Sequence, residues 1–106
     1  MAISRTTQAK TGVIIVDGDG LIHIAYCDMC RQVEGSERGL LCYARIGNDG
    51  VSRQFLDQGK PMSCGVYPSL ASGPAGRMAV SYQYDTTGGR DRNQEVIKVA
   101  ILEGAE

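Results

Sequence analysis

The sequence has no tryptophan, one phenylalanine and one histidine among its 106 residues. A large aromatic core is therefore excluded, and a catalytic triad built on His23 lacks a credible serine partner. No apolar stretch approaches the ~20 residues that a membrane-spanning helix needs. The first ten residues lack the apolar middle of a secretion signal, which indicates a cytoplasmic protein; a secreted protein whose signal has been removed is the alternative.

An excess of charge of one sign is also missing. The net charge is −1, and the lysines and arginines never form a run. Nucleic acids and anionic membranes bind basic patches, so neither is an expected partner. Glycine is abundant instead, and the 14 glycines interrupt every apolar pattern that has helical spacing. The length fits one domain, and we predict a single all-β domain over residues 1–106.

Short apolar runs bounded by Gly, Asp and Asn predict four strands, at 12–16, 21–27, 40–46 and 51–56. Asp19-Gly20 suits a two-residue type I′ turn between the first two strands. We expect a polar loop over 28–39 and a tight turn over 47–50. These connections make the four strands an antiparallel meander.

The same pattern returns further along the chain, when the sequence is shifted so that Gly20 coincides with Gly76. Tyr26 and Ala44 then coincide with Tyr82 and Ala100 without a gap, and we call this shift the repeat offset. We therefore predict two repeats, at about 12–56 and about 68–102, with a second polar loop at 84–94. The second repeat ends before its fourth strand, and the 3–10 segment is expected to supply that strand.

Four segments carry a family resemblance: "DGDGLIHIAYCD" with "GLLCYARIG", and "GPAGRMAVSYQYD" with "EVIKVAIL". They resemble the repeats of sialidase-like β-propellers, where a glycine turn leads into a strand that ends in tyrosine. Residues 17–20 match part of the family's Asp-box, whose tryptophan is absent here. The arginine cluster and the Tyr/Glu pair of a sialidase active site have no counterpart.

The resemblance implies that each repeat is one propeller blade. Closed propellers use about four to eight blades, so two blades imply a homo-oligomer, with three chains giving six blades. The strand at 3–10 of one chain would then complete the second blade of its neighbour. A monomeric β-sandwich of two four-stranded sheets is the alternative, and a fragment of a longer propeller is a third.

Four cysteines form a separate candidate site, because Cys27, Cys30, Cys42 and Cys64 are all expected at one end of the domain. A Cys-x-x-Cys pair such as Cys27 and Cys30 is the commonest half of a zinc site. Zinc, one or two disulfides and incidental thiols all stay open. The second repeat has no cysteine at the matching positions, so the fold does not require these thiols.

The same end is predicted to bind a ligand, because loops beyond turn length often carry function. The candidate residues are Tyr26, Asp28, Arg31, Tyr82, Tyr84, Asp85 and Arg90. We predict a non-enzymatic binding module, with a carbohydrate or a small molecule as its ligand and no cofactor unless the cysteines hold zinc. A protein-interaction scaffold and a sialidase-like glycoside hydrolase are the alternatives. His23 is expected to be packed between sheets, and Asp17 and Asp19 to be turn residues rather than calcium ligands.

Overall fold

The computed structural model describes residues 9–60, 64–85 and 95–103, apart from the side chains of 9–11, 29–31, 65 and 66. These residues form an all-β structure with one 3-10 turn, η1 (Pro74–Gly76). The strands are β1 (Ala9–Val16), β2 (Ile22–Val33), β3 (Ser36–Gly47), β4 (Gly50–Gly59), β5 (Cys64–Ser72), β6 (Met78–Asp85) and β7 (Glu95–Leu102). Within this described part, no helix is long and apolar enough to cross a membrane.

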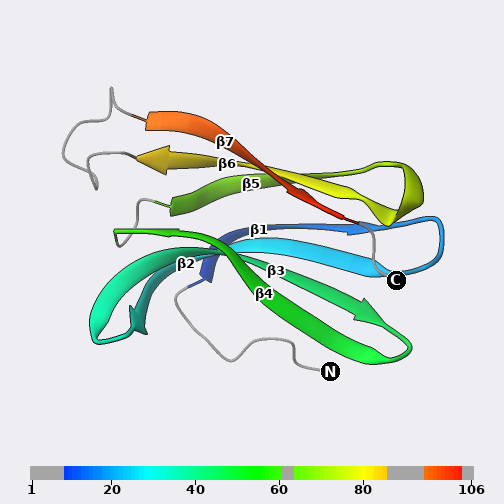
Figure 1. Ribbon diagram of the computed structural model, residues 1–106, viewed down its shortest axis with the longest axis horizontal. Coiled ribbons are helices and arrows are strands. Elements are labelled where there is room, and N and C mark those ends of the chain that lie inside the picture. Colours follow the sequence, from blue (N-terminus) through cyan, green and yellow to red (C-terminus); the bar gives the residue numbers. More distant parts are fainter. Residues whose placement is uncertain (1–8, 61–63, 86–94, 104–106) are drawn as a thin grey trace.

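The strands form two antiparallel sheets, each with its strands in chain order. Sheet 1 is β1-β2-β3-β4, and sheet 2 is β5-β6-β7. Strand β5 contacts all four strands of sheet 1 and holds the two sheets against each other (Figure 1). The predicted four-strand meander is confirmed, since the predicted strands fall within β1 to β4 to within one residue.

The predicted type I′ turn at Asp19-Gly20 is wrong. The last pair of β1 and β2 is Val16 with Ile22, which leaves a five-residue loop in which Gly20 has a φ of 85° and Asp19 has no positive φ. The Asp17 carboxylate accepts the N–H groups of Asp19 at 2.9 Å and Leu21 at 3.1 Å. Because the carboxylate satisfies these donors, the loop closes with one left-handed residue instead of two.

The predicted polar loop over 28–39 is also wrong. Strand β2 continues to Val33 and β3 begins at Ser36, so only Glu34 and Gly35 form the turn. Both have positive φ, 53° and 83°, as a type I′ hairpin turn requires. This end of the hairpin is polar because most of its described side chains meet water. The predicted tight turn over 47–50 is confirmed by the pairing of Gly47 with Gly50.

Positions that are related by the repeat offset have the same register in the two sheets. The β1–β2 pair Val16–Ile22 corresponds to the β5–β6 pair Ser72–Met78. The β2–β3 pair Ile22–Ile46 corresponds likewise to the β6–β7 pair Met78–Leu102. Equivalent positions are thus spaced as the repeat hypothesis requires, while a common origin of the two halves stays a prediction.

Two parts of the repeat hypothesis lie largely outside the described residues. Of the predicted strand at 3–10, residues 9 and 10 belong to β1, where Ala9 pairs with Asp28, and residues 3–8 are outside. Of the predicted loop at 84–94, residues 84 and 85 end β6, and 86–94 are outside. Completion of sheet 2 by the 3–10 segment therefore stays a prediction.

The core lies between the two sheets. Ala25 and Leu41 of sheet 1 meet Cys64, Val80 and Tyr82 of sheet 2, and all five are buried. Side chains alternate along a strand, so neighbouring residues point to the outer faces.

Both outer faces carry exposed apolar side chains. These are Ile14, Val16, Val51 and Phe55 on sheet 1, and Ile97, Val99 and Ile101 on sheet 2. Each sheet therefore has one apolar face against its neighbour and another against water.

Candidate functional site

The predicted ligand residues lie on different faces of the molecule. Tyr82 and Tyr84 share the inner face of sheet 2, next to the core. Tyr26 is on the outer face of sheet 1, where it packs with Leu40 and Cys42. The structure therefore brings two of the predicted tyrosines together and separates the third from them.

The acidic and basic candidates are more scattered. Asp28 is buried in β2 opposite Leu40, and Asp85 ends β6 opposite Glu95. Arg90 and the side chain of Arg31 lie outside the described residues. The only predicted ligand residues that meet within the described part are thus the two tyrosines of β6.

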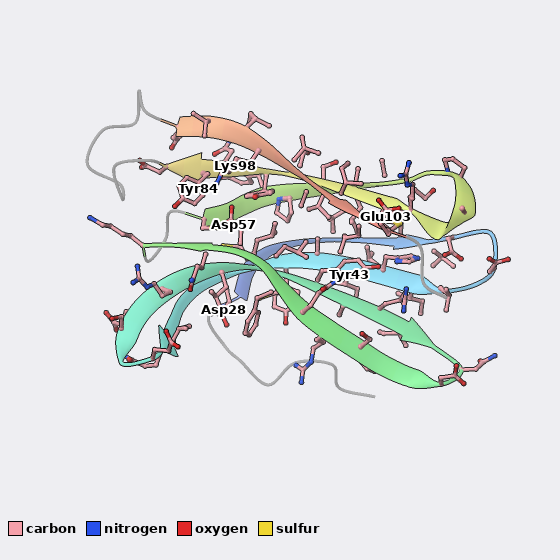
Figure 2. The ribbon with its side chains drawn as sticks, viewed as in Figure 1. Asp28, Tyr43, Asp57, Tyr84, Lys98 and Glu103 are labelled. Carbon is pink, nitrogen blue, oxygen red and sulfur yellow. The ribbon has the colours of Figure 1, made fainter. Side chains whose placement is uncertain are left out.

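Tyr82 and Tyr84 belong to a polar cluster that joins the two sheets around Asp57 of β4. The Tyr82 hydroxyl donates to Asp57 Oδ2 at 2.6 Å, and Lys98 Nζ of β7 donates to the same oxygen at 3.2 Å. The ammonium of Lys98 also lies 4.1 Å from the centre of the Tyr84 ring. Figure 2 shows Asp57, Tyr84 and Lys98 gathered at one end of the sheets.

The electrostatics of this cluster favour a charged carboxylate and neutral phenols. Partial burial opposes ionisation of Asp57, but hydrogen bonds from Tyr82, from the Gln58 N–H and from Lys98 outweigh it and hold its pKa below the ordinary value. Burial raises the pKa of Tyr82, and its hydrogen bond to Asp57 raises it further. Asp57 therefore ties β4 to β6 and β7.

The cysteines are divided between the two faces of sheet 1. The Cys27 thiol points to the core and donates to the Cys64 carbonyl at 3.0 Å, whereas Cys42 packs on the outer side. Burial raises the pKa of Cys27 to about 11 and that of Cys64 to about 12, so both are protonated at neutral pH. Among the described residues no three potential ligands surround a common point; the side chain of Cys30 is outside them, and zinc stays an untested alternative.

A second polar cluster, at the opposite end of the sheets, was not predicted. His23 Nε2 lies 2.8 Å from Asp17 Oδ2, and His23 Nδ1 lies 2.6 Å from the Tyr43 hydroxyl. The rings of His23 and Tyr43 stack with centroids 6.0 Å apart. With its proton on Nε2, the imidazole donates to Asp17 and accepts from Tyr43, so every polar group is satisfied. His23 is buried as predicted, and this network explains how it is accommodated.

The same network shifts the ionisation of its end members. The hydrogen bond from His23, helped by the two backbone N–H groups, lowers the pKa of Asp17. Burial raises the pKa of Tyr43. Both oxygens of Asp17 are already engaged, so this residue fixes the loop and the histidine rather than offering a free acceptor to a ligand.

A cleft of about 380 Å³ opens beside this network, between the hairpin loops 17–21 and 73–77. Figure 1 shows both loops at the same end of the molecule. Its polar lining residues are Asp17, Asp19, His23 and Arg45 from the first half of the chain, and Ser72 and Arg77 from the second. Arg77 is held at the rim by Glu103, with Nε–Oε1 and Nη2–Oε2 distances of 3.0 and 3.3 Å (Figure 2).

Sequence reasoning missed this cleft because its residues come from several strands and two loops. The one available signal was the pair of glycine loops that the repeat offset matches. Both are closed in the same way, by Asp17 N–H to the Leu21 carbonyl at 2.9 Å and by Gly73 N–H to the Arg77 carbonyl at 2.8 Å. Two equivalent loops of packed sheets lie at the same end, and the cleft forms between them.

Comparison with known proteins gives no relative for this chain. No family model, no curated protein and no solved structure matches it.

Proposed function

We propose that this chain is a non-catalytic binding module that holds a small, neutral, polyhydroxylated molecule such as a sugar in the cleft between loops 17–21 and 73–77. The charges of the lining support this ligand class, because the guanidinium groups of Arg45 and Arg77 balance the carboxylates of Asp17 and Asp19. Sugar hydroxyls need donors and acceptors in alternation, and the cleft offers both. Its volume of about 380 Å³ falls within the usual range for small-molecule sites.

The observation that carries the proposal is that the cleft wall is already ordered without a ligand. Asp17 accepts three hydrogen bonds, from His23 and from two backbone N–H groups, and so fixes the loop that forms one side. The ion pair of Arg77 with Glu103 restrains the other side. A preformed wall reduces the entropy that a ligand must lose in ordering the site.

The titratable groups support binding rather than catalysis. Asp17 and Asp57 have lowered pKa values, whereas Tyr43, Tyr82 and Cys27 have raised ones. A general acid or base works best with a pKa near the operating pH, and these shifts all lead away from neutrality. This pattern is what a chain that uses its polar groups for structure and recognition would have.

The finer architecture that we propose is a pair of propeller-type blades, one per sheet. The matching registers and the matching closure of the two glycine loops support it. In propellers, loops at one end of adjacent blades commonly form the ligand site, which is where the cleft lies.

Titration calorimetry and a glycan array test the function, with Arg45→Gln as the diagnostic variant. Loss of charge-assisted hydrogen bonds is expected to weaken binding by about 10-fold or more. Arg53→Gln is the matched control, because Arg53 is exposed on β4 and does not line the cleft. Asp19→Asn, at the exposed loop tip, is a second variant that does not depend on the packing of Arg45.

Saturable sugar binding that Arg45→Gln and Asp19→Asn weaken, and Arg53→Gln does not, is the expected result. The absence of binding to any sugar on the array, or equal losses in the cleft and control variants, contradicts the proposal. Capture of a protein instead of a sugar in a pull-down would favour the alternative function of an interaction scaffold.

A further inference from the structure

The interface between the two sheets joins unlike faces. The inner face of sheet 1 includes Val13, Ala25 and Leu41, and the repeat offset places these on Ser69, Ser81 and Ile97. Ser69 pairs with Ser81, and all three counterparts belong to the outer face of sheet 2. The inner face of sheet 1 is therefore equivalent to the outer face of sheet 2, and we call both of these the front face.

The reverse relation holds for the other two faces. The inner face of sheet 2 includes Leu70, Val80 and Ala100, and their counterparts are Ile14, Ile24 and Ala44. These three residues align across β1, β2 and β3 on the outer face of sheet 1. We call both of these the back face, so that within the chain the front of sheet 1 packs on the back of sheet 2.

A front-to-back contact leaves one front and one back unused on the same chain. The unused front carries Ile97, 67 % exposed, where its counterpart Leu41 is fully buried. The unused back carries Ile14, 60 % exposed, where its counterpart Leu70 packs against the core.

The two back faces also resemble each other in chemistry. Ile24 and Tyr26 on the unused back correspond to Val80 and Tyr82, which already accept a front face within the chain. The unused back therefore presents a branched aliphatic side chain and a tyrosine at the places where the used back presents the same.

We propose that the unused front of one copy, on β5–β7, docks on the unused back of a second copy, on β1–β4, and so repeats the interface that the chain makes internally. The occupant is a second copy because each chain carries both halves of a contact that its own two sheets show to fit. Burial of these apolar side chains drives the association. A contact between unlike patches is heterologous, and it closes into a ring when the rotation permits. This inference rests on the proposed equivalence of the two sheets and is independent of the ligand.

Two single substitutions, each blocking one face, test the pairing. Ile97→Glu blocks the front and Ile14→Glu blocks the back, and both positions are exposed, so neither change disturbs the core of the chain. Asn48→Glu at the exposed β3–β4 turn adds the same charge away from both faces. Sedimentation velocity of each variant alone, and of the two face variants mixed in equal amounts, gives the association state.

The expected result is that each face variant is a monomer alone, while Asn48→Glu associates like the unaltered chain. The mixture is expected to form two-chain particles and nothing larger, because Ile97→Glu retains a working back and Ile14→Glu a working front. An unaltered chain that stays monomeric overturns the association itself. Self-association of either face variant, or a mixture that stays monomeric, overturns the front-to-back pairing. Sugar binding by a monomeric chain would leave the proposed function standing in each case.

Discussion

At the scale of single residues, the polar groups inside this protein are placed by each other. Asp17, His23 and Tyr43 form a continuous hydrogen-bonded chain from the exposed loop into the core. Each member satisfies the next, which is how a histidine with 1 % exposure is accommodated between two sheets.

Replacement of Tyr43 by Phe is therefore expected to destabilise the chain. The change leaves His23 Nδ1 buried without its hydroxyl donor, which costs about 1–3 kcal/mol. Urea unfolding followed by circular dichroism measures the loss. Tyr84→Phe is the matched control, because it retains the ring beneath Lys98 and should change the free energy of unfolding far less. Equal losses in the two variants would show that the network does not stabilise the fold.

At the scale of the elements, glycine turns and apolar runs predict strands, and the turns themselves depend on local detail. The Asp17 carboxylate replaces one left-handed residue in loop 17–21. At the far end of β2, Glu34 occupies a left-handed position that glutamate rarely takes, with a φ of 53°.

Glu34→Asn is expected to stabilise the β2–β3 hairpin. Asn-Gly is the preferred pair for a type I′ turn, and relief of the strained glutamate backbone should raise the free energy of unfolding by a few tenths to about 1 kcal/mol. Asp49→Asn, in a two-residue turn whose Asn48 and Asp49 have no positive φ, is the control and should have little effect. A lower urea midpoint for Glu34→Asn would contradict the assignment of this turn.

These details explain what the sequence could and could not predict. The four strands of sheet 1 follow from alternation and from glycine, whereas the 28–39 hairpin does not, because strands with water on both sides show no apolar alternation. The contact of His23 with Tyr43 depends on the register of β2 against β3, and the cleft depends on how two sheets stack. Neither quantity is encoded in a local pattern, although the repeat offset predicted that the two sheets would share their register.

At the scale of the whole molecule, one carboxylate links the sheets across the core. Asp57 of β4 accepts hydrogen bonds from Tyr82 and Lys98 of sheet 2. The second sheet otherwise rests on sheet 1 mainly through β5 and the buried apolar cluster. The stability of the pair of sheets should therefore depend on the ionisation of this group.

Acidification is expected to weaken the chain in part through Asp57. Its pKa in the folded state lies below that of the unfolded state, so its stabilising contribution is present above about pH 4 and is lost as the pH falls through the folded value. Asp57→Asn should therefore show a smaller loss of unfolding free energy between about pH 5 and pH 2 than the unaltered chain. The measurement uses urea unfolding at one protein concentration, since association would shift the midpoint. Identical pH dependence in the two proteins would contradict this role.

The two apolar outer faces have the largest consequence for the whole molecule. One is a front and the other a back, and the chain already shows that a front packs on a back. Self-association is the arrangement that covers both faces with a single kind of contact.

Light scattering of the unaltered chain over a range of concentrations tests this claim most directly. We predict a mass that is a multiple of the 11.4 kDa of one chain, with a ring of three chains as the expected closed form. A constant mass of 11.4 kDa at every concentration, with both outer faces left to water, would contradict it.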